Sequence, residues 1–274
     1  MQQIERYEQK FLISPRTAQA LQKDILPHVQ RDKASSSGKY LVLSLYLDGE
    51  RLPLYKATTA NLPQRLKLRI RTYGSKLFYL EIKRKIRGMI WKSRVCLTLE
   101  QYSALFVSRR TQLRYRDRQA FTTLFQNLDT TQKNILEEFL YWKDVYGARP
   151  VMWVGYQREG FQSTDSTYAR VTFDSLIKAQ TCEDFSQTEQ LISSYHQRWR
   201  RLDYASVLKS QQADIILELK SERLVPEWMS HLTQKYNLRA VGVSKYGLAI
   251  ERHHYFADAR FKGLRQVPHQ NLTK

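Results

Sequence analysis

Apolar and polar residues alternate over several short segments of the chain. The clearest is residues 65–72, where Arg65, Lys67, Arg69 and Arg71 occupy every second position and leucine or isoleucine fills the positions between them. Successive side chains of a β-strand point to opposite faces, so this spacing predicts a strand with one charged and one apolar face.

The same alternation recurs in about seven segments. They are residues 4–12, 78–84, 90–97, 154–159, 168–174 and 215–220 besides 65–72, and a further strand is expected at residues 40–48. A turn is expected at Arg87 and Gly88, between two of these segments.

Helical signals lie between the strands. Ser14 followed by Pro15 is a typical helix start, and a second helix is expected to begin near Pro226. Residues 98–142 indicate several helices, whereas residues 183–201 fit a helix or a loop. We therefore expect one α+β domain over residues 4–256, built on an antiparallel β-barrel with surrounding helices, and a C-terminal tail over residues 257–274.

The chain carries a large excess of positive charge. The 274 residues include 45 Lys and Arg against 26 Asp and Glu, a formal net charge of +19. Such an excess indicates an anionic partner such as nucleic acid, an acidic membrane or a phosphate-rich molecule. A single charged strand face is typical of a solvated sheet surface, but like charges on neighbouring strands repel.

The repetition therefore favours an anion lying against the sheet, or enclosed by a barrel. The main acidic exceptions on these faces are Glu8, Glu81 and Glu218. Carboxylates among cations suit a divalent metal that bridges to phosphate oxygens.

Several other classes of protein are disfavoured by features that the sequence lacks. The sequence has no Gly-rich phosphate loop, no dinucleotide fingerprint, no apolar run long enough to span a bilayer and no secretory signal. Cys96 and Cys182 are far apart, which suits a reducing compartment. We expect a cytoplasmic protein.

The motifs, taken in order, resemble the VTC domain, the polyphosphate polymerase branch of the triphosphate tunnel (CYTH-like) metalloenzymes. They are Arg6-Tyr-Glu-Gln-Lys-Phe-Leu-Ile13, Ser44-Leu-Tyr-Leu-Asp48, Lys67-Leu-Arg-Ile-Arg-Thr-Tyr-Gly74, Leu80-Glu-Ile-Lys83, Lys92-Ser93, Tyr156-Gln-Arg158, Arg170-Val-Thr-Phe-Asp174, Leu217-Glu-Leu-Lys220 and Ser244-Lys-Tyr246.

This resemblance implies a closed tunnel of antiparallel strands in which the γ-phosphate of ATP is transferred to inorganic polyphosphate, releasing ADP, with Mn²⁺ or Mg²⁺. The cations that it marks as phosphate-binding or catalytic are Lys10, Arg69, Arg71, Lys83, Lys92, Arg158, Arg170, Lys220 and Lys245. Arg6, Lys67 and Tyr156 are expected to contact the substrate. Glu218 is the expected metal ligand, while Glu81 and Glu8 are either further ligands or partners of neighbouring cations.

Two positions depart from the wider pattern. Arg6 stands where the superfamily has the first glutamate of Glu-x-Glu-x-Lys, which favours the VTC branch. Gly242 stands where the eukaryotic polymerase has a lysine, so one cation is missing.

Alternatives to the polymerase remain. One is a metal-dependent triphosphatase acting on inorganic or nucleoside triphosphates, and another is a non-catalytic binder of polyphosphate or inositol polyphosphates. Nucleic-acid binding is not expected. A polymerase of this family is also expected near a membrane-protein partner that exports the polymer, which would place this cytoplasmic protein peripherally at the inner membrane.

Overall fold

The computed structural model describes residues 6–35, 38–74, 76–87, 89–107, 123–164, 168–203, 214–222 and 224–254. Two compact units divide the chain. Unit 1 comprises Met1–Leu43, Val154–Ala179 and Ser194–Ser244, and unit 2 comprises Ser44–Trp153, Gln180–Ser193 and Lys245–Lys274. The expected tail, residues 257–274, lies outside the described residues.

The described strands are β1 (Arg6–Ile13), β2 (Val29–Arg31), β3 (Tyr40–Asp48), β4 (Gln64–Thr72), β5 (Leu77–Ile86), β6 (Met89–Thr98), β7 (Arg149–Ser163), β8 (Ala169–Thr181), β9 (Arg200–Arg201) and β10 (Ile215–Glu222). The helices are α1 (Pro15–Ile25), α2 (Pro53–Thr59), α3 (Leu99–Phe106), α5 (Thr130–Val145), α6 (Thr188–Ser193), α7 (Glu227–Lys235) and α8 (Lys245–His254), with short 3₁₀ turns η1 (Lys33–Ser35) and η2 (Phe185–Gln187).

The strands form a large antiparallel sheet in the order β1-β10-β8-β7-β3-β4-β5-β6, with β2 paired to β7 and β9 to β8. The order starts at β1 and ends at β6, and among the described residues no pairing joins these two strands. The expected α+β class is confirmed. The closed barrel is not confirmed, although an antiparallel sheet of this kind is consistent with a tunnel-like fold.

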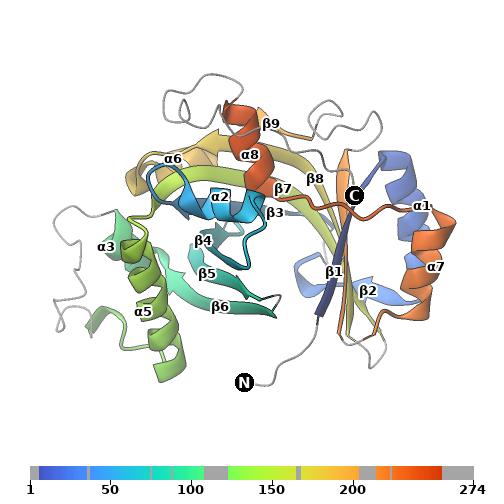
Figure 1. Cartoon of the computed structure of the whole chain (residues 1–274), viewed down its shortest axis with the longest axis horizontal. Coiled ribbons are helices and arrows are strands. Elements are labelled where there is room, and N and C mark those ends of the chain that lie inside the picture. Colours follow the sequence, from blue (N-terminus) through green and yellow to red (C-terminus); the bar gives the residue numbers. More distant parts are fainter. Residues whose placement is uncertain are drawn as a thin grey trace. The chain divides into compact units, whose positions relative to one another are not determined.

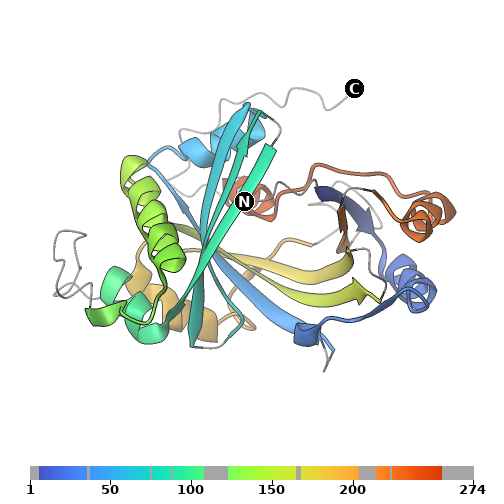
Figure 2. The same cartoon turned by 90° about the horizontal axis from the view of Figure 1, so that it is seen from below.

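In unit 2, strands β4, β5 and β6 are successive antiparallel neighbours, and helix α5 packs against β5 and β6 (Figure 2). Leu68, Ile82 and Leu136 are buried within this unit. Asp129 caps the start of α5 by accepting a hydrogen bond from the backbone N–H of Gln132 (2.8 Å). The apolar face of the strands is therefore covered, so their charged face is the one that remains available to a ligand.

In unit 1, helices α1 and α7 lie side by side (Figure 1). The ring of His28, which follows α1, stacks on Trp228 of α7 at 5.2 Å, and Asp24 accepts hydrogen bonds from Lys235 and Tyr236. These helices share an apolar core with strands β1, β8 and β10. The opposite faces of the three strands carry their charged residues.

The expected helices near both ends are confirmed. Ser14 accepts a hydrogen bond from the backbone N–H of Thr17 (3.1 Å) as the cap of α1, and α7 starts directly after Pro226. Residues 183–201 contain η2, α6 and β9, and the expected helical region holds α3 and α5. Residues 108–122 of that region lie outside the described residues. No helix in the described part of the chain is long and apolar enough to cross a membrane.

Candidate anion-binding surfaces

The charged residues on one face of β4, β5 and β6 in unit 2 are almost all cations. The antiparallel register places Lys67 opposite Lys83, and Lys83 opposite Lys92. We call this surface the cationic face; its members are Arg65, Lys67, Arg69, Arg71, Lys83, Lys85, Lys92 and Arg94, with Glu81 as the carboxylate among them. Because directly opposite residues lie about 5 Å apart, the side chains repel one another unless an anion compensates them.

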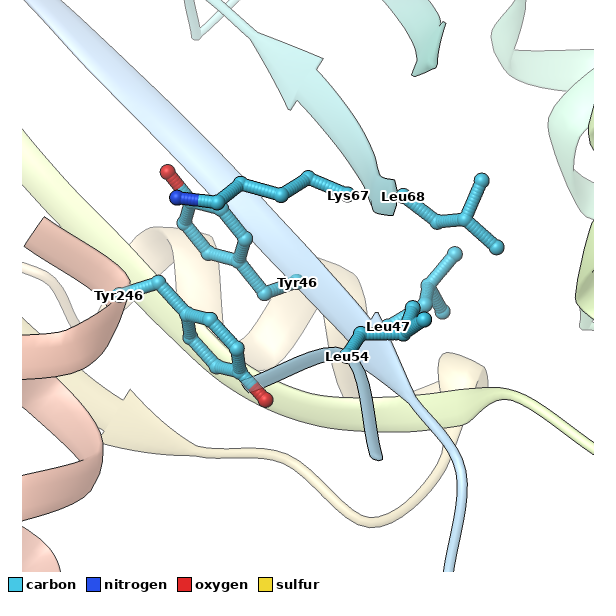
Figure 3. Close-up of a pocket in the computed structure, with 6 residues that line it drawn as sticks. All are labelled: Tyr46, Leu47, Leu54, Lys67, Leu68 and Tyr246. Carbon is cyan, nitrogen blue, oxygen red and sulfur yellow. The ribbon is translucent and has the colours of Figure 1, made fainter. Parts of the chain in front are cut away.

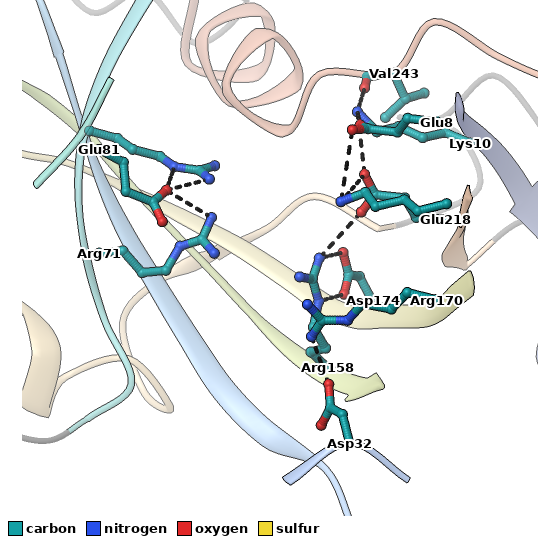
Figure 4. Close-up of polar contacts among 12 residues, drawn as sticks. Glu8, Lys10, Asp32, Arg71, Glu81, Arg158, Arg170, Asp174, Glu218 and Val243 are labelled. Atoms are coloured by element: carbon teal, nitrogen blue, oxygen red, sulfur yellow. Dashed lines mark hydrogen bonds and ion pairs between the residues drawn. The ribbon is translucent and has the colours of Figure 1, made fainter. Parts of the chain in front are cut away.

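Glu81 is the electrostatic centre of the cationic face (Figure 4). Its carboxylate pairs with the guanidiniums of Arg69 (2.5 Å) and Arg71 (3.5 Å) and with the ammonium of Lys92 (3.5 Å). Burial acts to raise the pKa of Glu81, but the charges of these three cations outweigh it and lower the pKa to about 2. Glu81 therefore stays ionised and pairs with all three cations, while its expected role in the site stays a prediction.

Arg71 of the cationic face has a buried donor that makes no hydrogen bond among the described residues. Only 7% of the residue is exposed, and its Nε atom is buried without a hydrogen-bond partner among the described residues. Its contact with Glu81 is long for a charge-assisted hydrogen bond. Burying a guanidinium donor without an acceptor costs free energy. A bound anion would supply the missing acceptor and remove this cost.

Lys92 is also electrostatically unusual. Burial of the ammonium lowers the pKa of Lys92 to about 8, against the opposing attraction of Glu81, and the charges of Arg69, Arg71 and Arg94 act in the same direction as burial. Even so, 48% of the side chain is exposed. Lys92 can therefore reach a ligand and can lose its charge just above neutral pH.

A cluster of aromatic residues supports the same face. Arg69 donates a hydrogen bond to the hydroxyl of Tyr46 (3.4 Å), and the Tyr46 ring stacks on Tyr246 with centroids 4.6 Å apart. Burial acts to raise the pKa of Tyr46, but Arg69, Lys67 and Arg71 lower it overall. Figure 3 shows Tyr46, Tyr246 and Lys67 lining one small pocket. Tyr246 directly follows Lys245, so this packing positions Lys245 at the start of α8.

In unit 1, charges on the sheet face are balanced. Lys10 pairs with Glu8 (3.1 Å), and Lys220 pairs with Glu218 (3.1 Å) and Glu8 (3.8 Å). Lys10 also lies 4.0 Å from Glu218 and donates to the carbonyl of Val243 (3.5 Å) (Figure 4). Cations and carboxylates alternate here, so this face lacks the positive excess of the cationic face.

The two arginines of unit 1 are held by acidic partners. Arg158 donates to both oxygens of Asp174 (2.6 and 2.7 Å), and Arg170 donates to Asp32 (2.6 Å). Burial acts to lower the pKa of Arg158, but the Asp174 carboxylate raises it well above its ordinary value. The Arg158 guanidinium also lies 5.2 Å over the ring of Tyr156. Arg158 therefore has a structural partner in addition to its expected contact with phosphate.

The expected metal ligands fall in both units. Glu8 and Glu218 belong to unit 1 and share the lysine partners described above, whereas Glu81 belongs to unit 2. Carboxylate oxygens are the donors that Mn²⁺ and Mg²⁺ prefer, so Glu8, Glu81 and Glu218 have the chemistry of such ligands, and the metal site stays a prediction. Among the described residues, no group of three or more His, Cys, Asp or Glu side chains is arranged to hold a metal.

Sequence reasoning missed several residues of these surfaces. The sequence does not single out Tyr46, Asp48 or Asp32, and it does not show that Asp174 is the partner of Arg158. Asp48 and Tyr46 do lie within one of the quoted motifs, which was the available signal. The side chain of Arg6 lies outside the described residues.

Comparison with known proteins agrees with these charged strands. Residues 5–254 match the VTC domain. The chain belongs to the VTC domain family. No curated protein matches this VTC domain chain. A solved structure, that of the PH1819 protein from Pyrococcus Horikoshii OT3, is similar with a TM-score of 0.44 and 11% identity, covering 90% of this chain and 99% of the other.

Proposed function

We propose that this VTC domain protein is a polyphosphate polymerase, which transfers the γ-phosphate of ATP to a growing inorganic polyphosphate chain and releases ADP. The observation that carries the proposal is the cationic face, where a single carboxylate stands among the Lys and Arg side chains of three neighbouring strands. Membership of the VTC domain family supports a polyphosphate-related function.

Phosphoryl transfer requires little covalent help from the protein. It requires in-line positioning of the reacting groups and compensation of the charge on the phosphoryl oxygens. Arg71 can donate to phosphate oxygens in a fixed planar geometry, whereas Lys83 and Lys92 act as point charges. A terminal polyphosphate oxygen is already ionised near neutral pH, so the acceptor needs no general base.

We further propose that Glu218, with Glu8, holds a divalent ion, Mn²⁺ or Mg²⁺. Such an ion supplies additional positive charge to the phosphate oxygens of the nucleotide. The chain's own contribution is to orient both carboxylates, through their ion pairs with the ammonium groups of Lys10 and Lys220.

The decisive assay incubates the full chain with ATP and Mn²⁺ and separates the products on a gel. We expect long polyphosphate and ADP. Free phosphate without polymer would identify a triphosphatase, and binding without any product would identify a polyphosphate sensor; either result would overturn the polymerase.

Arg71→Ala should reduce polymer synthesis by at least about a hundredfold, because it removes a donor to the transition-state charge. Arg84→Gln is the matched control: Arg84 lies on the opposite face of β5 and pairs with Glu138 of α5 (2.9 Å). Equal rates in the two variants would show that the cationic face does not take part.

Glu218→Gln should raise the Mn²⁺ concentration needed for half-maximal rate by about tenfold or more, because a neutral amide binds a hard cation poorly. Titrating Mn²⁺ against polymer synthesis measures this change. An unaltered metal requirement would place the ion on other ligands.

A further inference from the structure

Exposed apolar side chains gather at one end of the β5–β6 hairpin in unit 2. Met89 is 44% exposed and Ile90 is 53% exposed at the start of β6. Leu62, 48% exposed, precedes β4 at the same end, where the backbone N–H of Arg87 donates to the carbonyl of Pro63 (2.9 Å). We call this region the hairpin tip; it comprises Leu62, Arg65, Lys85, Arg87, Met89 and Ile90.

The strand register sets which way these side chains point. Met89 lies opposite Ile86, and Ile90 lies opposite Lys85, so the two neighbouring residues face opposite sides of the hairpin. Both sides of the hairpin tip therefore present an apolar group to solvent. Neither group is needed to fill the core, because each remains about half exposed.

The charged residues of the hairpin tip itself are all cations. Between Glu50 and Glu100 the sequence contains one carboxylate, Glu81, which belongs to the cationic face. Arg65 and Lys85 are directly opposite each other, and Arg87 is exposed beside them. Their long aliphatic stems can lie along an apolar surface while the charged ends reach polar groups.

We propose that the hairpin tip docks the protein on an anionic lipid bilayer. Apolar side chains that enter the boundary between headgroups and acyl chains, flanked by cations that meet anionic headgroups, are the combination that binds peripheral proteins to such membranes. A free phosphate chain offers nothing to Met89 and Ile90. The absence of any carboxylate among the residues of the hairpin tip favours a uniformly anionic surface such as a layer of lipid headgroups.

The first experiment measures co-sedimentation of the full chain with vesicles at physiological salt. One set contains phosphatidylcholine with phosphatidylglycerol and the other phosphatidylcholine alone. We expect binding to the anionic vesicles and at least about tenfold weaker partitioning for the double variant Met89→Ser with Ile90→Ser, because the apolar contribution is lost.

Leu224→Ser is the matched control, since Leu224 is 77% exposed in unit 1 and away from the hairpin tip in sequence. It should bind like the unaltered protein. Equal binding by the double variant and the control would overturn the proposal, because the net charge alone would then explain adsorption.

A second measurement reports insertion directly. Trp91 follows Ile90 in β6 and is half-buried, so vesicles with brominated acyl chains should quench its fluorescence when the hairpin tip inserts. Trp91→Phe should remove that quenched component, and the double variant should reduce it. Absence of Trp91 quenching in vesicle-bound protein would overturn insertion. Binding of the double variant to duplex DNA is measured in parallel. A double variant that binds DNA more weakly but vesicles equally well would also overturn the proposal.

Discussion

At the scale of single residues, the cationic face depends on how few acidic groups it contains. Glu81 is shared by three cations, and its pKa of about 2 keeps it charged at any physiological pH. Lys92 is the member whose charge can change, because its pKa is lowered to about 8. Above that pH the ammonium becomes a neutral amine and no longer attracts phosphate.

The affinity for tripolyphosphate should therefore fall as pH rises from about 7 to about 9. Loss of one charge-assisted contact predicts about tenfold weaker binding at the upper end of this range. Lys92→Arg should flatten the profile, because a guanidinium stays charged throughout. Calorimetric titration at several pH values measures both, and identical pH profiles would exclude Lys92 as the titrating group.

At the scale of elements, Asp48 joins three pieces of unit 2. This buried carboxylate at the end of β3 accepts hydrogen bonds from the backbone N–H groups of Leu54 and Tyr55 (both 2.9 Å), the first turn of α2. It also accepts one from the hydroxyl of Tyr246 in α8 (3.0 Å). Burial raises the pKa of Asp48 although these bonds oppose it. Asp48 therefore replaces the missing side-chain cap of α2 and ties α8 to the sheet.

Asp48→Asn should destabilise the protein by about 2–4 kcal/mol, since an amide leaves buried donors without acceptors. Tyr246→Phe retains the aromatic stacking on Tyr46 and should cost only about 1 kcal/mol. Urea denaturation of both variants gives the two free energies of unfolding. Equal losses would mean that the caps of α2 contribute nothing.

At the scale of the whole molecule, the cations behind the net charge of +19 are compensated differently in the two units. In unit 1, the strand residues Lys10, Arg158, Arg170 and Lys220 each pair with a carboxylate. On the cationic face of unit 2, three cations share the single carboxylate of Glu81. Repulsion among those cations opposes folding until an anion neutralises it. A phosphate chain should therefore bind the folded protein and stabilise it.

Tripolyphosphate should raise the melting temperature by several degrees, because a ligand at a hundred times its Kd stabilises the native state by about 2.7 kcal/mol. Sodium chloride at equal ionic strength controls for general screening. Arg71→Ala should show a much smaller shift. A melting temperature unaltered by tripolyphosphate would count against an anion site on this protein.

Much of the local structure could be predicted from the sequence. The strand predicted at residues 40–48 is β3 (Tyr40–Asp48), the predicted cap at Ser14 starts α1, and the helix predicted near Pro226 is α7. These features depend on neighbours within a few residues, so local periodicity suffices. The pair Arg170–Asp32 could not be predicted, since it joins segments far apart in the chain. The pair Arg158–Asp174 depends on how strands β7 and β8 align, which neither segment encodes alone.

By itself, the sequence determined which face of each strand is charged, because alternation along a strand is a local property. It also determined the family, through motifs that keep their order. Only the tertiary structure decided which cations lie beside each other. The strand register places Lys67, Lys83 and Lys92 in one row across the sheet. It also brings Glu81 into ion pairs with Arg69 and Arg71. Register arises from pairing between strands and from burial of their apolar faces, which no single segment encodes.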